Sequence, residues 1–175
     1  MIANQTRSAR VGPELAALGE HLQQRFGAGL AAILFYGSCL RSGDALDGLV
    51  DLYLLVDDYR CSGQGLLRRG LNWLLPPNVF YLELPLADGV RVRAKYALLS
   101  LPQLTRGTSK RWFQAYLWGR FAQPTALLHA RDSAAEQAVI SALGQAALTL
   151  ARLCYDTLLD YGLDAVRDCA EKEGE

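Results

Sequence analysis

The stretch that decides the fold is AAILFYGSCLRSGDALDGLVDLYLLVDD, residues 31–58. Its first part, Ala31 to Tyr36, is a short apolar run closed by Gly37-Ser38, which predicts a buried strand followed by a turn. Its last part, Val50 to Val56, is a second apolar run and predicts a second buried strand. The stretch therefore indicates strand, Gly-Ser turn, polar loop and strand.

The Gly37-Ser38 turn has the chemistry of an anion site. Glycine lets the backbone approach an anion closely because it has no Cβ. The Ser38 hydroxyl and the N–H groups that follow it can donate to phosphate oxygens, especially if a helix begins there. We therefore expect this turn to bind phosphate.

One acid, Asp51, lies near the start of the second apolar run. A buried carboxylate is strongly unfavourable unless it is paired or binds a cation, and Mg²⁺ is the cation that we expect. Asp47 or Asp44, in the loop between the two strands, could supply a further ligand. The alternative for both is a solvated loop carboxylate.

A Gly-Ser turn, a polar loop and an acid on an apolar strand together resemble the nucleotidyltransferase fold of the polymerase-β-like enzymes. In those enzymes the turn grips the triphosphate, and two acids two residues apart bind the metal. Here the pair is incomplete, because Leu49 or Tyr53 stands at the other position, depending on whether Asp51 is the second acid or the first. We favour Asp51 as the second acid, because an aliphatic run follows it directly.

Four segments in order resemble the mitochondrial-type phosphatidate cytidylyltransferases, the CDP-diacylglycerol synthases that also have bacterial relatives. They are YGSC (36–39), VDLYLLVDD (50–58), NVFYLELPL with GVRVRAKYALLS (78–100), and RWFQAYLWGRFAQPT (111–125). The sequence departs from the family pattern at Cys39, Ala97, Ala122 and Thr125, and the family's longer helical C-terminal region is hardly present.

The resemblance implies transfer of CMP from CTP to phosphatidic acid, giving CDP-diacylglycerol and pyrophosphate with Mg²⁺ as cofactor. It implies that Asp51 and Lys95 are catalytic and that Asp51 holds the metal, and Asp47 is our candidate to replace the missing acid of the pair. The residues that it implies for nucleotide binding are Tyr36, Gly37, Ser38 and Arg120. Two alternatives stay open: a nucleotidyltransferase with another acceptor, and a degenerate nucleotide-binding homologue without activity.

The expected fold is α+β, a nucleotidyltransferase-like mixed sheet flanked by helices. Residues 1–130 would form this domain, and residues 131–175 a short C-terminal helical extension of it. Apolar spacing predicts helices over residues 12–26, 66–75, 111–123 and 134–159, with a polar connection over 102–110 and a charged, fraying end over 164–175.

A hairpin is predicted for residues 79–86 and 90–100 across the turn triplet Ala87-Asp88-Gly89. Alternation along its second strand places Arg91, Arg93 and Lys95 on one face. Phosphate neutralisation by Lys95, with Arg93 a further candidate, is one interpretation. The other is a solvated face, or cations paired with Glu83.

The composition narrows the partners. With 175 residues, 51% of them hydrophobic, the chain can bury the core of one domain. Eighteen basic and eighteen acidic residues give a formal net charge of zero, so the chain has no overall excess of positive charge. We therefore expect that it does not bind nucleic acid. The four cysteines lack CxxC spacing, and no apolar run reaches the ~18 residues of a membrane span. We expect a cytoplasmic protein that meets CTP and phosphatidic acid at a membrane surface, with a homodimer left open.

Overall fold

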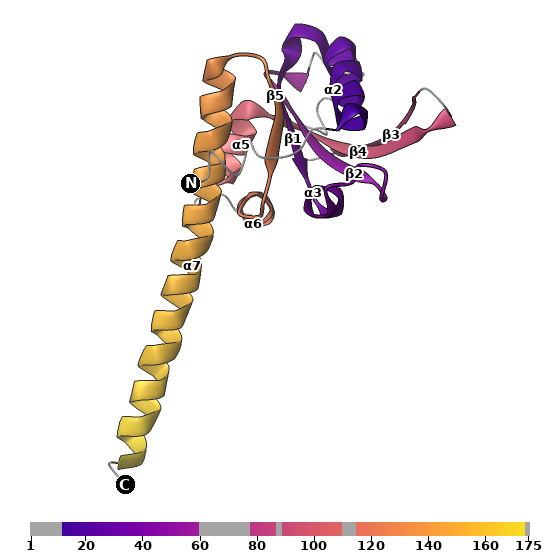
Figure 1. The fold of residues 1–175 in the computed structure, drawn as a ribbon. Coiled ribbons are helices and arrows are strands. Elements are labelled where there is room, and N and C mark those ends of the chain that lie inside the picture. The colour runs from indigo at the N-terminus through magenta and orange to yellow at the C-terminus, as the bar shows by residue number, and fades with distance from the viewer. Residues whose placement is uncertain (1–11, 60–77, 87–88, 110–114, 174–175) are drawn as a thin grey trace.

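Five strands form one mixed sheet in the order β3-β4-β2-β1-β5 (Figure 1). The computed structural model describes residues 12–59, 78–86, 89–109 and 115–173. The strands are β1 (Leu30–Tyr36), β2 (Val50–Val56), β3 (Asn78–Pro85), β4 (Arg91–Ser100) and β5 (Ala126–Ala130). Strands β2 and β4 run parallel, and every other neighbouring pair is antiparallel. The α+β class, a mixed sheet flanked by helices, is confirmed.

Helices cover both faces of the sheet. On one face, α2 (Pro13–Phe26) buries Leu18 and Leu22 against Ile33 and Leu52 of the two central strands. On the other face, α5 (Leu101–Gly107), α6 (Tyr116–Phe121) and the first half of α7 (Ser133–Glu173) share a second core with Tyr53. A sheet between two layers of helix explains why β2 is apolar on both sides.

The stretch from residue 31 to residue 58 folds as its pattern predicts. Strands β1 and β2 pair along their length, and the short helix α3 (Ser38–Ser42) begins at the Gly-Ser turn. The predicted hairpin is also confirmed, since β3 and β4 pair antiparallel. Its turn residues 87–88, the predicted helix over 66–75 and the first residues of the one over 111–123 lie outside the described residues.

The predicted polar connection over residues 102–110 is wrong, because most of it is helix α5. Ser100, the last residue of β4, is the N-cap: its side chain accepts a hydrogen bond from the Gln103 N–H at 3.3 Å. The Gln103 side chain completes a capping box with the Ser100 N–H. Strand β5 was also not predicted as a sheet strand, because its five residues carry no clear alternation.

The C-terminal helical region is longer than predicted. Helix α7 is a single helix of 41 residues that continues to Glu173, so the extension is neither short nor frayed from residue 164 (Figure 1). Its segment Ser133–Gly162 is long and apolar enough to cross a membrane by length and composition, contrary to the expectation that no such run exists. Val139, Ala142 and Ala146 of this segment are buried in the core between α7 and the sheet.

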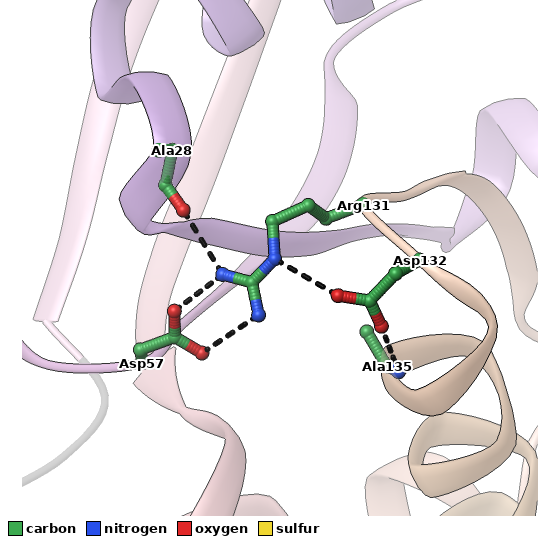
Figure 2. Close-up of polar contacts among 5 residues, drawn as sticks. All are labelled: Ala28, Asp57, Arg131, Asp132 and Ala135. Carbon is green, nitrogen blue, oxygen red and sulfur yellow. Dashed lines mark hydrogen bonds and ion pairs between the residues drawn. The ribbon is translucent and has the colours of Figure 1, made fainter.

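Arg131, just before α7, contacts the residues that precede β1 and follow β2 (Figure 2). Its guanidinium donates to the Ala28 carbonyl at 2.9 Å and pairs with Asp57 after β2 and with Asp132. Asp57, which directly follows β2, thus serves as the partner of Arg131. Asp132 accepts from the Ala135 N–H, and this bond and Arg131 lower the pKa of Asp132. The hydrogen bond from the Ala135 N–H to Asp132, at the start of α7, is therefore strongest when Asp132 is ionised, and it weakens in acid.

Replacing Ser100 by alanine removes the acceptor of the capping box. We expect the free energy of unfolding to fall by about 1 kcal/mol, the usual effect of losing an N-cap side chain. Ser100→Thr keeps the hydroxyl and is the matched control, with a smaller loss. Urea denaturation followed by circular dichroism measures both, and equal losses in the two variants would show that the hydroxyl has no capping role.

Candidate functional site

Four polar side chains form a row across four neighbouring strands. Tyr36 of β1 lies opposite Asp51 of β2, Asp51 lies beside Lys95 of β4, and Lys95 lies opposite Tyr81 of β3. Residues directly opposite one another project from the same face of a sheet. Tyr36 contributes to the core beneath α6, so the row opens on the face that α5, α6 and α7 partly cover.

Asp51 and Lys95 form an ion pair at the centre of this row. The Lys95 Nζ lies 2.9 Å from Asp51 Oδ1, with side-chain exposures of 44% for the lysine and 14% for the aspartate. Oδ1 is buried, and apart from this ammonium the described residues bring no hydrogen-bond donor to it. Lys95 thus places a positive charge against the Asp51 carboxylate.

Gly37 lies directly against Asp51. Its backbone has φ 90° and ψ −157°, which favours glycine, and a Cβ at this position would collide with the Asp51 carboxylate, lying 3.0 Å from its Cγ. Ser38 is exposed at the first position of α3. The Gly-Ser turn and the acid therefore meet in space, as their order in the sequence predicted.

Arg120 of α6 brings a second positive charge to the site. Its guanidinium carbon lies 5.1 Å from the ring centroid of Tyr36 and 5.8 Å from that of Tyr116, which are cation–π distances. Tyr53 fixes this corner, because its hydroxyl donates to the Tyr116 hydroxyl at 3.2 Å and its ring packs 5.2 Å from that of Tyr36. Arg120 is thereby held over the end of β1.

The hydroxyl of Tyr36 stays protonated at neutral pH. Burial, and then the negative charge of Asp51, raise its pKa to about 12, although Arg120 acts in the opposite direction. Burial also raises the pKa of Tyr53. Both hydroxyls can therefore donate hydrogen bonds, and Tyr36 presents a donor beside the Asp51 carboxylate.

Asp51 is the carboxylate of the row that could hold a magnesium ion. No three His, Cys, Asp or Glu side chains come together among them. Asp47 is exposed, and its backbone carbonyl, like that of Leu49, accepts a hydrogen bond from the Cys39 thiol. Mg²⁺ in nucleotide sites is commonly held by one or two carboxylates together with phosphates and waters. Asp51, which lies against the Gly-Ser turn, fits the position of such a carboxylate.

The structure brings together most of the residues that the sequence singled out and adds three. The predicted residues that meet around Asp51 are Tyr36, Gly37, Lys95 and Arg120. Sequence reasoning missed Tyr53, Tyr81 and Tyr116. The spacing held a signal for two of them, since Tyr53 follows Asp51 by two residues on a strand and Tyr116 precedes Arg120 by four on a helix.

The outer cations of β4 follow the alternative interpretation. Arg91 pairs with Glu83 across the hairpin at 3.1 Å, and both side chains are exposed. Arg93, directly opposite Glu83, is also exposed. Of the three cations on this strand, Lys95 is the one in the row with Asp51.

Comparison with models of protein families finds no family that matches the chain, and comparison with curated proteins finds no relative. The resemblance to the phosphatidate cytidylyltransferases therefore stays a prediction.

Gly37→Ala tests the contact between the turn and Asp51. We expect it to lower the free energy of unfolding by more than the ~1–2 kcal/mol of a left-handed non-glycine residue, because the new Cβ also displaces the carboxylate. Gly43→Ala is the matched control: Gly43 has φ 76°, and a Cβ there meets nothing within 4 Å. Chemical denaturation compares the two, and equal losses would show that the contact is unimportant.

Proposed function

We propose that this protein is a nucleotidyltransferase that transfers CMP from CTP to phosphatidic acid, with Mg²⁺, as the sequence resemblance implies. The observation that carries the proposal is the contact of Gly37 with Asp51, beside Lys95, with Arg120 over the ring of the adjacent Tyr36. A glycine turn, one carboxylate and two cations at one place suit the transfer of a phosphoryl group between anions.

The reaction needs positioning and charge neutralisation more than proton transfer. A phosphate oxygen of phosphatidic acid attacks the α-phosphorus of CTP, the bond to the β-phosphate breaks, and pyrophosphate leaves. The attacking oxygen is already anionic, so no strong base is required. What the protein must do is hold two anions in line, and proximity and electrostatic stabilisation can together supply most of the rate enhancement.

Each residue of the row has a role in that scheme. Lys95 offsets the charge of the approaching phosphates, and Arg120, held by Tyr36 and Tyr116, offers a second positive charge near the Gly-Ser turn. The Tyr36 hydroxyl donates to a phosphate oxygen. Mg²⁺, when bound with the nucleotide, would be held by Asp51 and would supply further neutralisation of phosphate charge.

A second candidate, a nucleotide-binding protein without activity, is favoured by the Asp51–Lys95 ion pair. The ammonium already neutralises the carboxylate that a catalytic metal would use. In this case the site would bind nucleotide equally well with and without Mg²⁺, and it would release no pyrophosphate.

The first experiment follows label from radiolabelled CTP into the organic phase, using purified full chain, Mg²⁺ and vesicles containing phosphatidic acid. We expect label transfer, and we expect Asp51→Asn to reduce it by about 100-fold or more, because the change removes the one carboxylate of the row. Asp57→Asn is the matched control at the other end of β2 and should retain activity.

Lys95→Met tests the lysine in the same assay. Loss of transfer comparable with that of Asp51→Asn supports a role for Lys95 in neutralising phosphate. Nucleotide bound without Mg²⁺ and without turnover would replace the enzyme proposal by the binding protein. CTP consumed to pyrophosphate only when another acceptor is added would retain the transferase and reject the lipid.

A further inference from the structure

The hairpin of β3 and β4 has an exposed face. In Figure 1 the hairpin extends away from α5, α6 and α7, the helices that cover this side of the other strands. Along β3 every second side chain is exposed, and on β4 the change from exposed to buried falls between Lys95 and Ala97. The polar row of Tyr36, Asp51, Lys95 and Tyr81 therefore runs from the covered part of the sheet into its open part.

Tyr81 is the aromatic side chain at the open end of this row. It lies directly opposite Lys95 and is 60% exposed. Because directly opposite residues project from the same face of a sheet, its ring lies beside the ammonium that pairs with Asp51. Phosphoryl transfer uses the cations and the carboxylate of the row, and it requires no phenol ring at this position. The place of Tyr81 is instead one for a part of the substrate that does not react.

The spacing of the row fits a nucleotide that lies across the strands. Neighbouring strands are ~4.8 Å apart, so Tyr81, two strands away from Asp51, is at roughly 10 Å from it along the sheet. A nucleoside 5′-phosphate is of comparable length from base to phosphorus, because the sugar separates the two. With its α-phosphate beside Asp51 and its outer phosphates at the Gly-Ser turn, which lies against that carboxylate, a nucleotide reaches β3 with its base.

We propose that Tyr81 is the platform on which the base of the bound nucleotide stacks, an inference that rests on the proposed function. A nucleotide has an uncharged planar base at one end and anionic phosphates at the other. The row is divided in the same way, with the neutral Tyr81 ring at one end and the Arg120 guanidinium over Tyr36 at the other. Every base has a π-face, so stacking contributes affinity and not the choice of base.

Charge on the same face favours a nucleotide over a membrane lipid as the occupant. Glu83 follows Tyr81 by two residues, projects from the same face of β3 and is exposed. It pairs with Arg91 at 3.1 Å, so this cation of β4 is already neutralised. An exposed acid beside the ring is unfavourable at an anionic bilayer, whereas it lies outside the row along which the phosphates would bind.

Isothermal titration calorimetry of the full chain with Mg²⁺ tests the proposal, using CTP and its abasic analogue ribose 5-triphosphate. The two ligands share sugar and phosphates and differ in the base. We expect the unmodified chain to bind CTP about tenfold more tightly, the usual order of effect for one stacked base. Tyr81→Ala should weaken CTP binding by about tenfold and leave the affinity for the abasic analogue unchanged, so that the difference between the ligands disappears.

Two variants serve as controls. Tyr81→Phe keeps the ring and should bind CTP as the unmodified chain does. Val79→Ala is the matched truncation, because Val79 is 61% exposed, two residues away on the same face of the same strand. It should change neither affinity. Circular dichroism confirms that each variant folds.

Three results would overturn the stacking role and leave nucleotide transfer intact. They are unchanged CTP affinity in Tyr81→Ala, an equal loss for CTP and the abasic analogue in that variant, and a loss in Tyr81→Phe as large as in Tyr81→Ala. Unchanged CTP affinity together with weaker binding of phosphatidate vesicles by Tyr81→Ala would assign the ring to lipid. An unmodified chain that binds neither CTP nor the abasic analogue would overturn the proposed function and this inference together.

Discussion

The balance of charge at Asp51 is the constraint on which the centre of the molecule depends. This carboxylate lies on β2, whose remaining residues are buried and apolar, and the positive charge beside it comes from the parallel neighbour β4. An unpaired charge at this depth is strongly unfavourable. The register between β2 and β4 is therefore fixed by polar pairing as well as by apolar packing, and the close approach of Gly37 follows from the same geometry.

Local pattern was sufficient for the main elements between residues 12 and 59 and for the hairpin. Apolar runs bounded by glycine define β1 and β2, helical spacing of leucines defines α2, and alternation defines the faces of β4. These signals act over a few residues, so they do not depend on the rest of the chain. The same holds for the Gly-Ser turn, since its glycine conformation is a property of the turn itself.

The remainder depended on contacts between distant residues. The pairing of Asp51 with Lys95 requires β4 to lie beside β2, an order that no local pattern encodes. Helix α5 begins with a capping box whose Ser100 also ends a strand, so the strand pattern concealed the helix signal. Strand β5 is defined by its antiparallel pairing with β1, on the side of β1 away from β2, which a local pattern does not indicate. The placement of Tyr116 and Arg120 over Tyr36 depends on α6 docking on the sheet.

The form of α7 has a consequence for its own order. Its first half gains stability from the core, through residues such as Val139 and through the bond from the Thr149 hydroxyl to the Thr108 carbonyl at 3.0 Å. In its projecting half, residues 150–162 are all exposed, and an isolated helix of ~12–15 residues is marginal in water. The amide hydrogens of that half should therefore exchange faster than those of the half that packs on the sheet.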